Sequence, residues 1–364
     1  MLVDKLYVYD VITLLTVFMA RENIRRLQRV GKATFSVSLP KRWVRERGLK
    51  PGDLLMVVEE EDGSLRVKSP TSKEEKVICT INAELCGAPG LLGRIIVGCY
   101  HQGYDNVRVM SNHGFRREQL REIAETVDRL PGFEIVEQSP RRIVIQSFID
   151  PARFPLEGLL KRLQVIVATM LNNLIDYLET NRQAYLENIE ELEEKVDELY
   201  FLVLRLIISY LRRRELGEPL RIDSPPYASG ARVVAKTLEE IADFLTSIAK
   251  ELKRMRRQGI KLDKDSAKIL RRYAEFIHLL FGKSMKSFFS MDAILANEVI
   301  EQVNEFIGGE EAMGITPALQ EHPIHLQYMT WSLGYMVRNC RVIAEVALNR
   351  FVRNNTPICS LARV

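Results

Sequence analysis

The sequence predicts a mainly α-helical protein with an α+β N-terminal part. From Pro155 onward the apolar residues recur with the period of an α-helix. Residues 23–70 and 74–149 instead contain short β-branched and aromatic runs separated by turn residues. A chain of 364 residues is also too long for one compact core, so several domains are expected.

The five cysteines are scattered along the chain and contain no CxxC pair. They are Cys79, Cys86, Cys99, Cys340 and Cys359. An odd, widely spaced set argues against a disulfide framework and against a zinc ribbon. This pattern favours a reducing, cytoplasmic location.

Residues 1–22 form an N-terminal extension of uncertain role. Its apolar run, residues 11–20, is too short to cross about 30 Å of hydrocarbon, so we expect no stable membrane insertion. We expect translation to start at Met19, which makes residues 1–18 an over-extended reading frame. A short packing helix is the alternative.

Residues 23–70 are predicted to form one domain of β-strands and turns around one short helix. The helix, residues 41–48, follows Pro40 and ends at Gly48, and Asp62–Gly63 forms a turn between two strands. After a linker, residues 74–149 alternate strand and helix, which predicts a small α/β connector domain.

Two groups of three long helices are predicted, over residues 155–258 and 263–352. The clearest apolar stripe lies at the end of the first group and consists of Val234, Leu238, Ile241, Leu245, Ile248, Leu252 and Met255. Its steps of four and three residues are typical of helices packed in a bundle. Residues 238–250 and 333–345 resemble each other, which an internal duplication of a three-helix unit explains. Coincidence between amphipathic helices is the alternative.

Basic residues are concentrated near the N-terminus. Residues 21–50 contain ten Lys or Arg and two Asp or Glu, a net charge of +8, whereas the whole chain carries +4. Such an asymmetry is typical of a nucleic-acid-binding surface, because neutralised phosphates supply much of the affinity. A solvated charged surface is the simpler alternative for charge alone.

This basic region resembles the SpoVT/AbrB family of swapped-hairpin DNA-binding domains. The resemblance is carried by Leu39–Pro40, the short basic helix, residues 48–53 (GLKPGD) and the Asp62–Gly63 turn. It implies a homodimer in which two chains interleave their hairpins. The residues it places against DNA are Arg25, Arg26, Arg29, Lys32, Lys41, Arg42 and Arg45. The segment from Gly31 to Pro40 is longer than the common family pattern, so the roles of side chains in that hairpin stay open.

Two helices carry carboxylates at the spacing i,i+4. Glu193 and Asp197 lie on one predicted helix face, and Glu239 and Asp243 lie on the next helix. If the helices are antiparallel neighbours, the four carboxylates converge and can hold a cation through hard oxygen ligands. A solvated acidic face is the alternative.

The surrounding residues, LEEIADFLTSIAK and ELEEKVDEL, resemble the helices of the PhoU family. The resemblance covers about residues 155–352 and implies a divalent or iron metal site formed by those four carboxylates. The second half departs from the pattern, with Gly334 and Arg338 in place of Glu and Asp, and Asn304 in place of Asp197. We therefore expect no metal cluster there. Arg338 and Arg341 would instead attract an anion or form a salt bridge to a neighbouring acidic helix.

Together these resemblances imply a phosphate-responsive transcriptional regulator that represses phosphate uptake. The alternative is an adaptor that does not bind DNA and docks on a phosphate transporter ATPase or a signalling kinase. Neither hypothesis involves catalysis, and the sequence contains no P-loop, GxSxG or HExxH motif. The operator sequence, the direction of regulation and the identity of the metal cannot be predicted from these residues.

Overall fold

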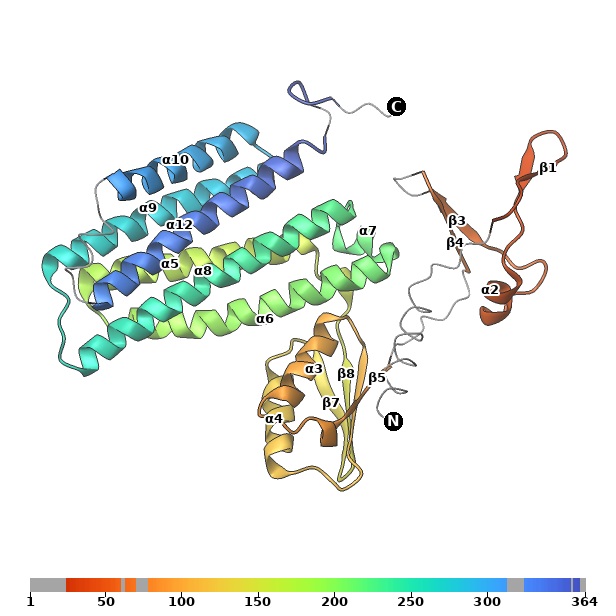
Figure 1. Cartoon of the computed structure of the whole chain (residues 1–364), viewed down its shortest axis with the longest axis horizontal. Coiled ribbons are helices and arrows are strands. Elements are labelled where there is room, and N and C mark those ends of the chain that lie inside the picture. The colour runs from red at the N-terminus through yellow and green to blue at the C-terminus, as the bar shows by residue number, and fades with distance from the viewer. Residues whose placement is uncertain (1–23, 60–62, 70–77, 313–323, 355, 361–364) are drawn as a thin grey trace, which may run out of the picture. The chain divides into compact units, whose positions relative to one another are not determined.

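The computed structural model describes residues 24–59, 63–69, 78–312, 324–354 and 356–360 (Figure 1). The chain divides into two compact units, Met1–Glu75 and Lys76–Val364. The predicted N-terminal extension lies outside the described residues, as do Asp62 and nearly all of the linker between the units. The fold is mainly α-helical with an α+β N-terminal part, as the sequence predicts.

The first unit contains two separate β-hairpins and one short helix. Strands β1 (Gln28–Val30) and β2 (Thr34–Ser36) are antiparallel, and so are β3 (Met56–Glu59) and β4 (Leu65–Lys68). The helix α2 (Lys41–Glu46) lies between the hairpins in sequence. Gly48 and Gly52 have positive φ angles of 63° and 95°, which glycine adopts without strain as the chain leaves α2 and turns toward β3.

The described part of the first unit has no buried apolar side chain. Apolar residues that would form a core are instead exposed, among them Phe35 at 63%, Met56 at 54% and Val57 at 58%. Met56 and Val57 are neighbours in β3, so their side chains project from opposite faces of the strand. Within the described residues, this hairpin therefore has no wholly polar face.

The second unit begins with a four-stranded sheet of order β5-β6-β8-β7. Its strands are β5 (Ile78–Asn82), β6 (Asn106–Met110), β7 (Phe133–Ser139) and β8 (Arg142–Ser147). The edge strand β5 is parallel to β6, and the other pairs are antiparallel. Helices α3 (Leu91–His101) and α4 (Arg117–Asp128) cover the same side of the sheet (Figure 1). A core that includes Ile96, Val107, Ile123 and Ile145 fills the space between them.

After the sheet, the described part of the second unit contains six long helices, which lie side by side (Figure 1). The first group is α5 (Leu156–Thr180), α6 (Ala184–Arg212) and α8 (Pro225–Arg257), with the short α7 (Gly217–Leu220) before α8. The second group is α9 (Lys264–Ser290), α10 (Ala293–Ala312) and α12 (Ile324–Phe351).

The two groups of helices share one continuous apolar core. Every residue of the predicted stripe in α8 is buried, from Val234 at 0% exposure to Met255 at 5%. Helix α8 packs against α12, and α5 packs against α9, so the core crosses the boundary between the groups. The two three-helix groups are therefore halves of one bundle.

Arg205 joins the α/β part to the bundle. This residue of α6 is 3% exposed and donates hydrogen bonds to the backbone oxygens of Tyr100 (3.1 Å) and Tyr104 (2.9 Å). Its Nη2 also lies 2.8 Å from Oδ1 of Asp105. A buried guanidinium with several partners fixes the orientation of the two parts, because each lost bond leaves a polar group without a partner. Within the described residues, no helix is both long and apolar enough to span a membrane.

Candidate metal centre and nucleic-acid interface

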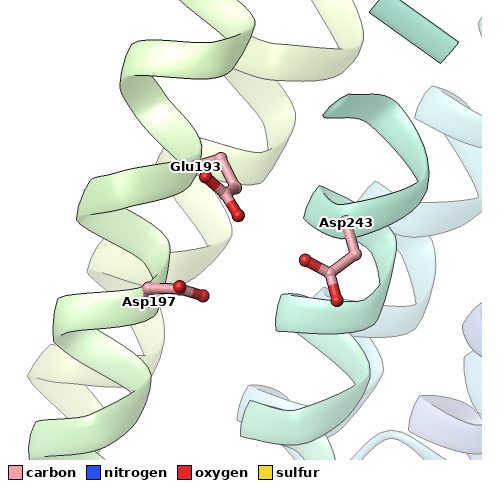
Figure 2. Close-up of side chains that lie close together, drawn as sticks. All are labelled: Glu193, Asp197 and Asp243. Carbon is pink, nitrogen blue, oxygen red and sulfur yellow. The ribbon is translucent and has the colours of Figure 1, made fainter. Parts of the chain in front are cut away.

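Three carboxylates converge between α6 and α8. Glu193 and Asp197 project from α6 toward Asp243 of α8, as Figure 2 shows. One oxygen atom of each lies within 4.8 Å of the others. The spacing i,i+4 explains the pair on α6, and the buried stripe of α8 fixes the face on which Asp243 lies.

The electrostatics of this acidic cluster favour a cation. Burial and the neighbouring Asp197 raise the pKa of Glu193, and burial and Asp243 raise the pKa of Asp197. Burial also raises the pKa of Asp243, which Lys236 and Lys250 partly oppose. Three carboxylates so close together repel one another, and a shared divalent cation relieves that repulsion.

A guanidinium from the α/β part already lies against this cluster. Arg129 follows α4 directly, and its Nη2 lies 3.1 Å from Oδ2 of Asp197. Arg129 thus places a positive charge where a bound cation would act. The donor set, made of carboxylate oxygens alone, fits a hard divalent ion.

Glu239 does not join the cluster, although the sequence places it there. Its carboxylate lies 2.5 Å from Nζ of Lys236, one turn earlier on α8. Lys236 also approaches Glu240 at 3.8 Å. The predicted set of four is therefore a group of three, with Glu239 held by a lysine beside it.

The corresponding positions of the second half carry different contacts. Arg341 donates to Oδ1 of Asn304 at 3.1 Å and pairs with Glu345 at 2.8 Å. Arg338 donates to the backbone oxygen of Gly334 in its own helix at 3.2 Å. The acidic partner of Arg341 lies one turn along α12, not on a neighbouring helix as the sequence suggested.

All seven basic residues predicted to face DNA are exposed. Arg25 and Arg26 precede β1, and Arg29 and Lys32 lie in or beside the first hairpin. The Nη2 of Arg29 donates to the backbone oxygen of Lys32 at 2.7 Å.

The other three predicted contacts, Lys41, Arg42 and Arg45, lie within α2. Arg42 is paired with Glu46 of the same helix. Because both side chains are exposed, this pair is weak enough for a phosphate to displace the carboxylate.

Two arginines that make contacts between the α/β part and the bundle, Arg129 and Arg205, were not among the predicted residues. Arg129 approaches the cluster only because the α/β part packs against α6 through α3, a contact that no local motif encodes. Arg205 does leave a signal, since it interrupts the apolar run of residues 201–210 (FLVLRLIISY). A charge within such a run indicates a buried ion pair or hydrogen-bonded site.

Two family models match the chain. The PhoU domain model matches residues 160–252, from α5 to α8. The model of the antidote-toxin recognition domain MazE, a bacterial antitoxin, matches residues 28–76, which cover the hairpins and α2. The chain thus combines a MazE/AbrB-like domain with a PhoU domain, which confirms the predicted fusion.

One solved structure to which the chain is similar is the crystal structure of PhoU from Pseudomonas aeruginosa. The match has 15% sequence identity and a TM-score of 0.47, and it covers 54% of this chain and 95% of that chain. Comparison with curated proteins gives no match.

Proposed function

We propose that this protein is a dimeric, cytoplasmic transcriptional regulator that responds to phosphate and represses its uptake. The observation that carries the proposal is the fusion of a basic MazE/AbrB-like domain to a PhoU domain in one chain. The first domain would bind DNA, and the second would sense phosphate status. The protein would therefore act by binding and not by catalysis.

The charge of the first unit supports DNA binding. Its seven predicted contact residues are exposed, and three of them lie together on the short helix α2. Lys and Arg side chains that contact phosphates release condensed counterions, which makes the affinity depend steeply on salt. Base recognition would come from the hairpins, whose side chains can reach groove edges.

The exposed apolar surface of the first unit supports a homodimer. Isolated two-stranded hairpins are marginally stable in water, and both faces of β3 carry exposed apolar side chains. A second copy of the unit would cover these residues with its own hairpins. Operator binding by two such copies would then follow the twofold symmetry of the dimer.

The acidic cluster supports a metal-dependent sensor. Glu193, Asp197 and Asp243 would hold a divalent or iron ion through their carboxylate oxygens. The ion would supply a positive charge that attracts phosphate or a phosphorylated partner. Because Arg129 contacts the same cluster, occupancy would also affect the contact between the α/β part and the bundle.

The test is a titration of the full chain against DNA from upstream of the host's phosphate-uptake genes, followed by fluorescence anisotropy at several salt concentrations. The triple variant K41A/R42A/R45A removes the three positive charges of α2. The control K261A/K264A/K268A removes three exposed lysines of the second unit, with the same change in net charge. We expect selective, salt-dependent binding whose salt slope falls by about one for each lost phosphate contact in the first variant only. Equal binding to random DNA would refute the proposal.

A second candidate function, an adaptor that docks on another protein, is favoured by exposed aromatic residues on the bundle. Trp331 of α12 is 55% exposed, and its ring lies 4.4 Å from that of Tyr335. Phe244 of α8 lies 5.5 Å from Tyr335. Tryptophan and tyrosine are enriched where proteins bind one another tightly.

The two functions respond differently to one substitution. If the chain is an adaptor, Trp331→Ala would abolish binding to a phosphate transporter ATPase or signalling kinase. If it is a DNA-binding regulator, the same variant would bind operator DNA as tightly as the unchanged chain. Surface plasmon resonance with each partner immobilised measures both affinities.

A further inference from the structure

Two cysteines of the α/β part lie in contact with each other. The Sγ atoms of Cys79 in β5 and Cys99 in α3 are 3.2 Å apart, and the thiol of Cys99 donates to the sulfur of Cys79. The residues are twenty positions apart in sequence, so the contact results from the packing of α3 on the sheet. Cys79 lies on an edge strand and is half-buried, whereas Cys99 is 5% exposed.

We propose that Cys79 and Cys99 form a reversible disulfide when the protein meets a peroxide. Neither the predicted DNA-binding residues nor the acidic cluster contributes a residue to this pair. A disulfide has a sulfur–sulfur distance of about 2.05 Å, so the two atoms need to approach by only about 1 Å. That movement is within reach of side-chain rotation, because neither sulfur is held by a metal or a disulfide.

The chemistry needs one peroxide molecule for each disulfide. The sulfur of Cys79 attacks one peroxide oxygen, the O–O bond breaks, and water leaves with the formation of a sulfenic acid. The sulfur of Cys99 then attacks the sulfenic sulfur, the S–O bond breaks, and a second water leaves. Two thiols are oxidised by two electrons, and hydrogen peroxide is reduced to two water molecules.

The environment of the pair assigns the order of these steps. Cys79 is the more accessible sulfur and meets the peroxide first. Burial, together with the neighbouring Cys79, raises the pKa of Cys99 to about 12, so Cys99 is a protonated hydrogen-bond donor before the reaction. It gives its proton to the leaving hydroxide only as it attacks the sulfenic sulfur, which makes it the second sulfur to react.

The other three cysteines are hydrogen bonded to oxygen. Cys86 donates to the backbone oxygen of Asn82 at 3.5 Å, and Cys359 donates to that of Val352 at 3.9 Å. Cys340 is fully buried and is hydrogen bonded with Ser284. These three thiols serve as internal controls for the specificity of oxidation.

The bond would connect two elements with different neighbours. Strand β5 is the first element after the linker from the first unit, and α3 packs against α6 of the bundle. A disulfide between them would restrict the separation of β5 from α3. Oxidised protein is therefore expected to show slower amide hydrogen exchange in β5 than reduced protein.

The experiment treats the reduced full chain with a few equivalents of hydrogen peroxide, blocks remaining thiols by alkylation and measures the intact mass. We expect the thiol count to fall from five to three. Before alkylation the mass should fall by about 2 Da, the two lost hydrogen atoms, and dithiothreitol should restore it. Tryptic digestion should yield a linked pair of peptides, residues 77–94 and 95–108.

Four variants assign the bond. Peptide 77–94 also contains Cys86, so Cys86→Ser must retain the linked pair, and Cys359→Ser must retain it too. Cys79→Ser and Cys99→Ser must each lose it. Five thiols that survive the treatment, or a linked pair that persists in Cys99→Ser, would overturn the proposal. A bond that forms only between two chains would overturn it as well.

Discussion

Arg205 of α6 and Asp105, which directly precedes β6, form an ion pair with an Nη2–Oδ1 distance of 2.8 Å. The same guanidinium lies 5.0 Å from the centre of the Tyr100 ring and 5.2 Å from that of Phe133. One side chain of the bundle is thus enclosed by the α/β part. This contact couples the α/β part, which follows the first unit in sequence, to the helices that carry the acidic cluster.

Replacement of Arg205 by alanine should destabilise the second unit by about 2 to 4 kcal/mol, because two backbone oxygens lose their partner and Asp105 loses its counter-charge. Urea denaturation measures this change. Arg212→Ala is the matched control, since Arg212 also bonds across the same contact, to the backbone oxygen of Gln102, but is exposed. An equal loss of unfolding free energy in both variants would contradict the role of Arg205 as a buried link between the α/β part and the bundle.

Replacement of Arg129 by glutamine should increase the affinity of the acidic cluster for Mn²⁺. The guanidinium competes with the cation for Asp197. The increase should be at most about fivefold, because an exposed ion pair contributes no more than about 1 kcal/mol. Isothermal titration calorimetry measures the affinity, and Arg117→Gln, an exposed arginine at the start of α4, should leave it unchanged.

Asp243→Asn should have opposite effects with and without metal. Without metal, the variant should be more stable than the unchanged chain by up to about 1 kcal/mol, because an exposed like charge is removed from the cluster. With Mn²⁺ present, it should lose the stabilisation that the ion provides. Thermal unfolding measures both, and Glu194→Gln, an exposed neighbour outside the cluster, should change neither. A metal-free variant that is less stable would refute the electrostatic account.

The stability difference between Asp243→Asn and the unchanged metal-free chain should depend on pH. Carboxyl groups with a pKa raised by folding contribute most favourably below their unfolded pKa of about 4, and this contribution is lost as the pH rises through the folded pKa. The advantage of the variant should therefore be present at pH 7 and vanish near pH 4.

The contribution of His101 to stability changes with pH in the opposite direction. Burial lowers its pKa to about 4, so its contribution to stability is lost as the pH falls from about 6.5 toward 4. The residue is the same in both chains and its effect cancels in the difference. An advantage of the variant that grows at low pH would contradict the assignment.

If the protein is the proposed DNA-binding homodimer, Val57→Glu should convert it to a monomer and weaken DNA binding. The side chain is 58% exposed in β3, and a charge there cannot be covered by the apolar hairpin of a second copy. Light scattering coupled to size-exclusion chromatography measures the mass. Val165→Glu, at an exposed valine of α5, is the control and should remain dimeric.

The order of the helices and strands follows from local patterns in the sequence. The spacing of the apolar residues in α8 is enough to predict that Val234 and Leu238 lie in a core, and both are buried. The separation of the helices into two groups was also visible, because Gly259 and the residues after it interrupt the pattern. The sequence does not show that both groups share one core, because this depends on contacts between the distant helices α8 and α12.

The acidic cluster was predictable in part. The i,i+4 spacing places Glu193 and Asp197 on one face of α6, and in the structure that face lies opposite Asp243 of α8. Glu239 lies outside this group of three and is paired with Lys236, a helix neighbour at i−3 that the i,i+4 rule ignores. Arg129 and the contact between Cys79 and Cys99 depend on how distant segments pack, and spacing carries no information about them.

The most direct test of the account is the operator affinity of the full chain with and without Mn²⁺ and inorganic phosphate, measured in all four combinations. If the PhoU domain senses phosphate and the basic domain binds DNA, the dissociation constant should change by about fivefold or more when both are added, as expected for allosteric coupling. Asp243→Asn should abolish that change while it keeps the affinity of the metal-free chain. Tight and selective DNA binding that is identical in all four combinations would contradict the phosphate-responsive function.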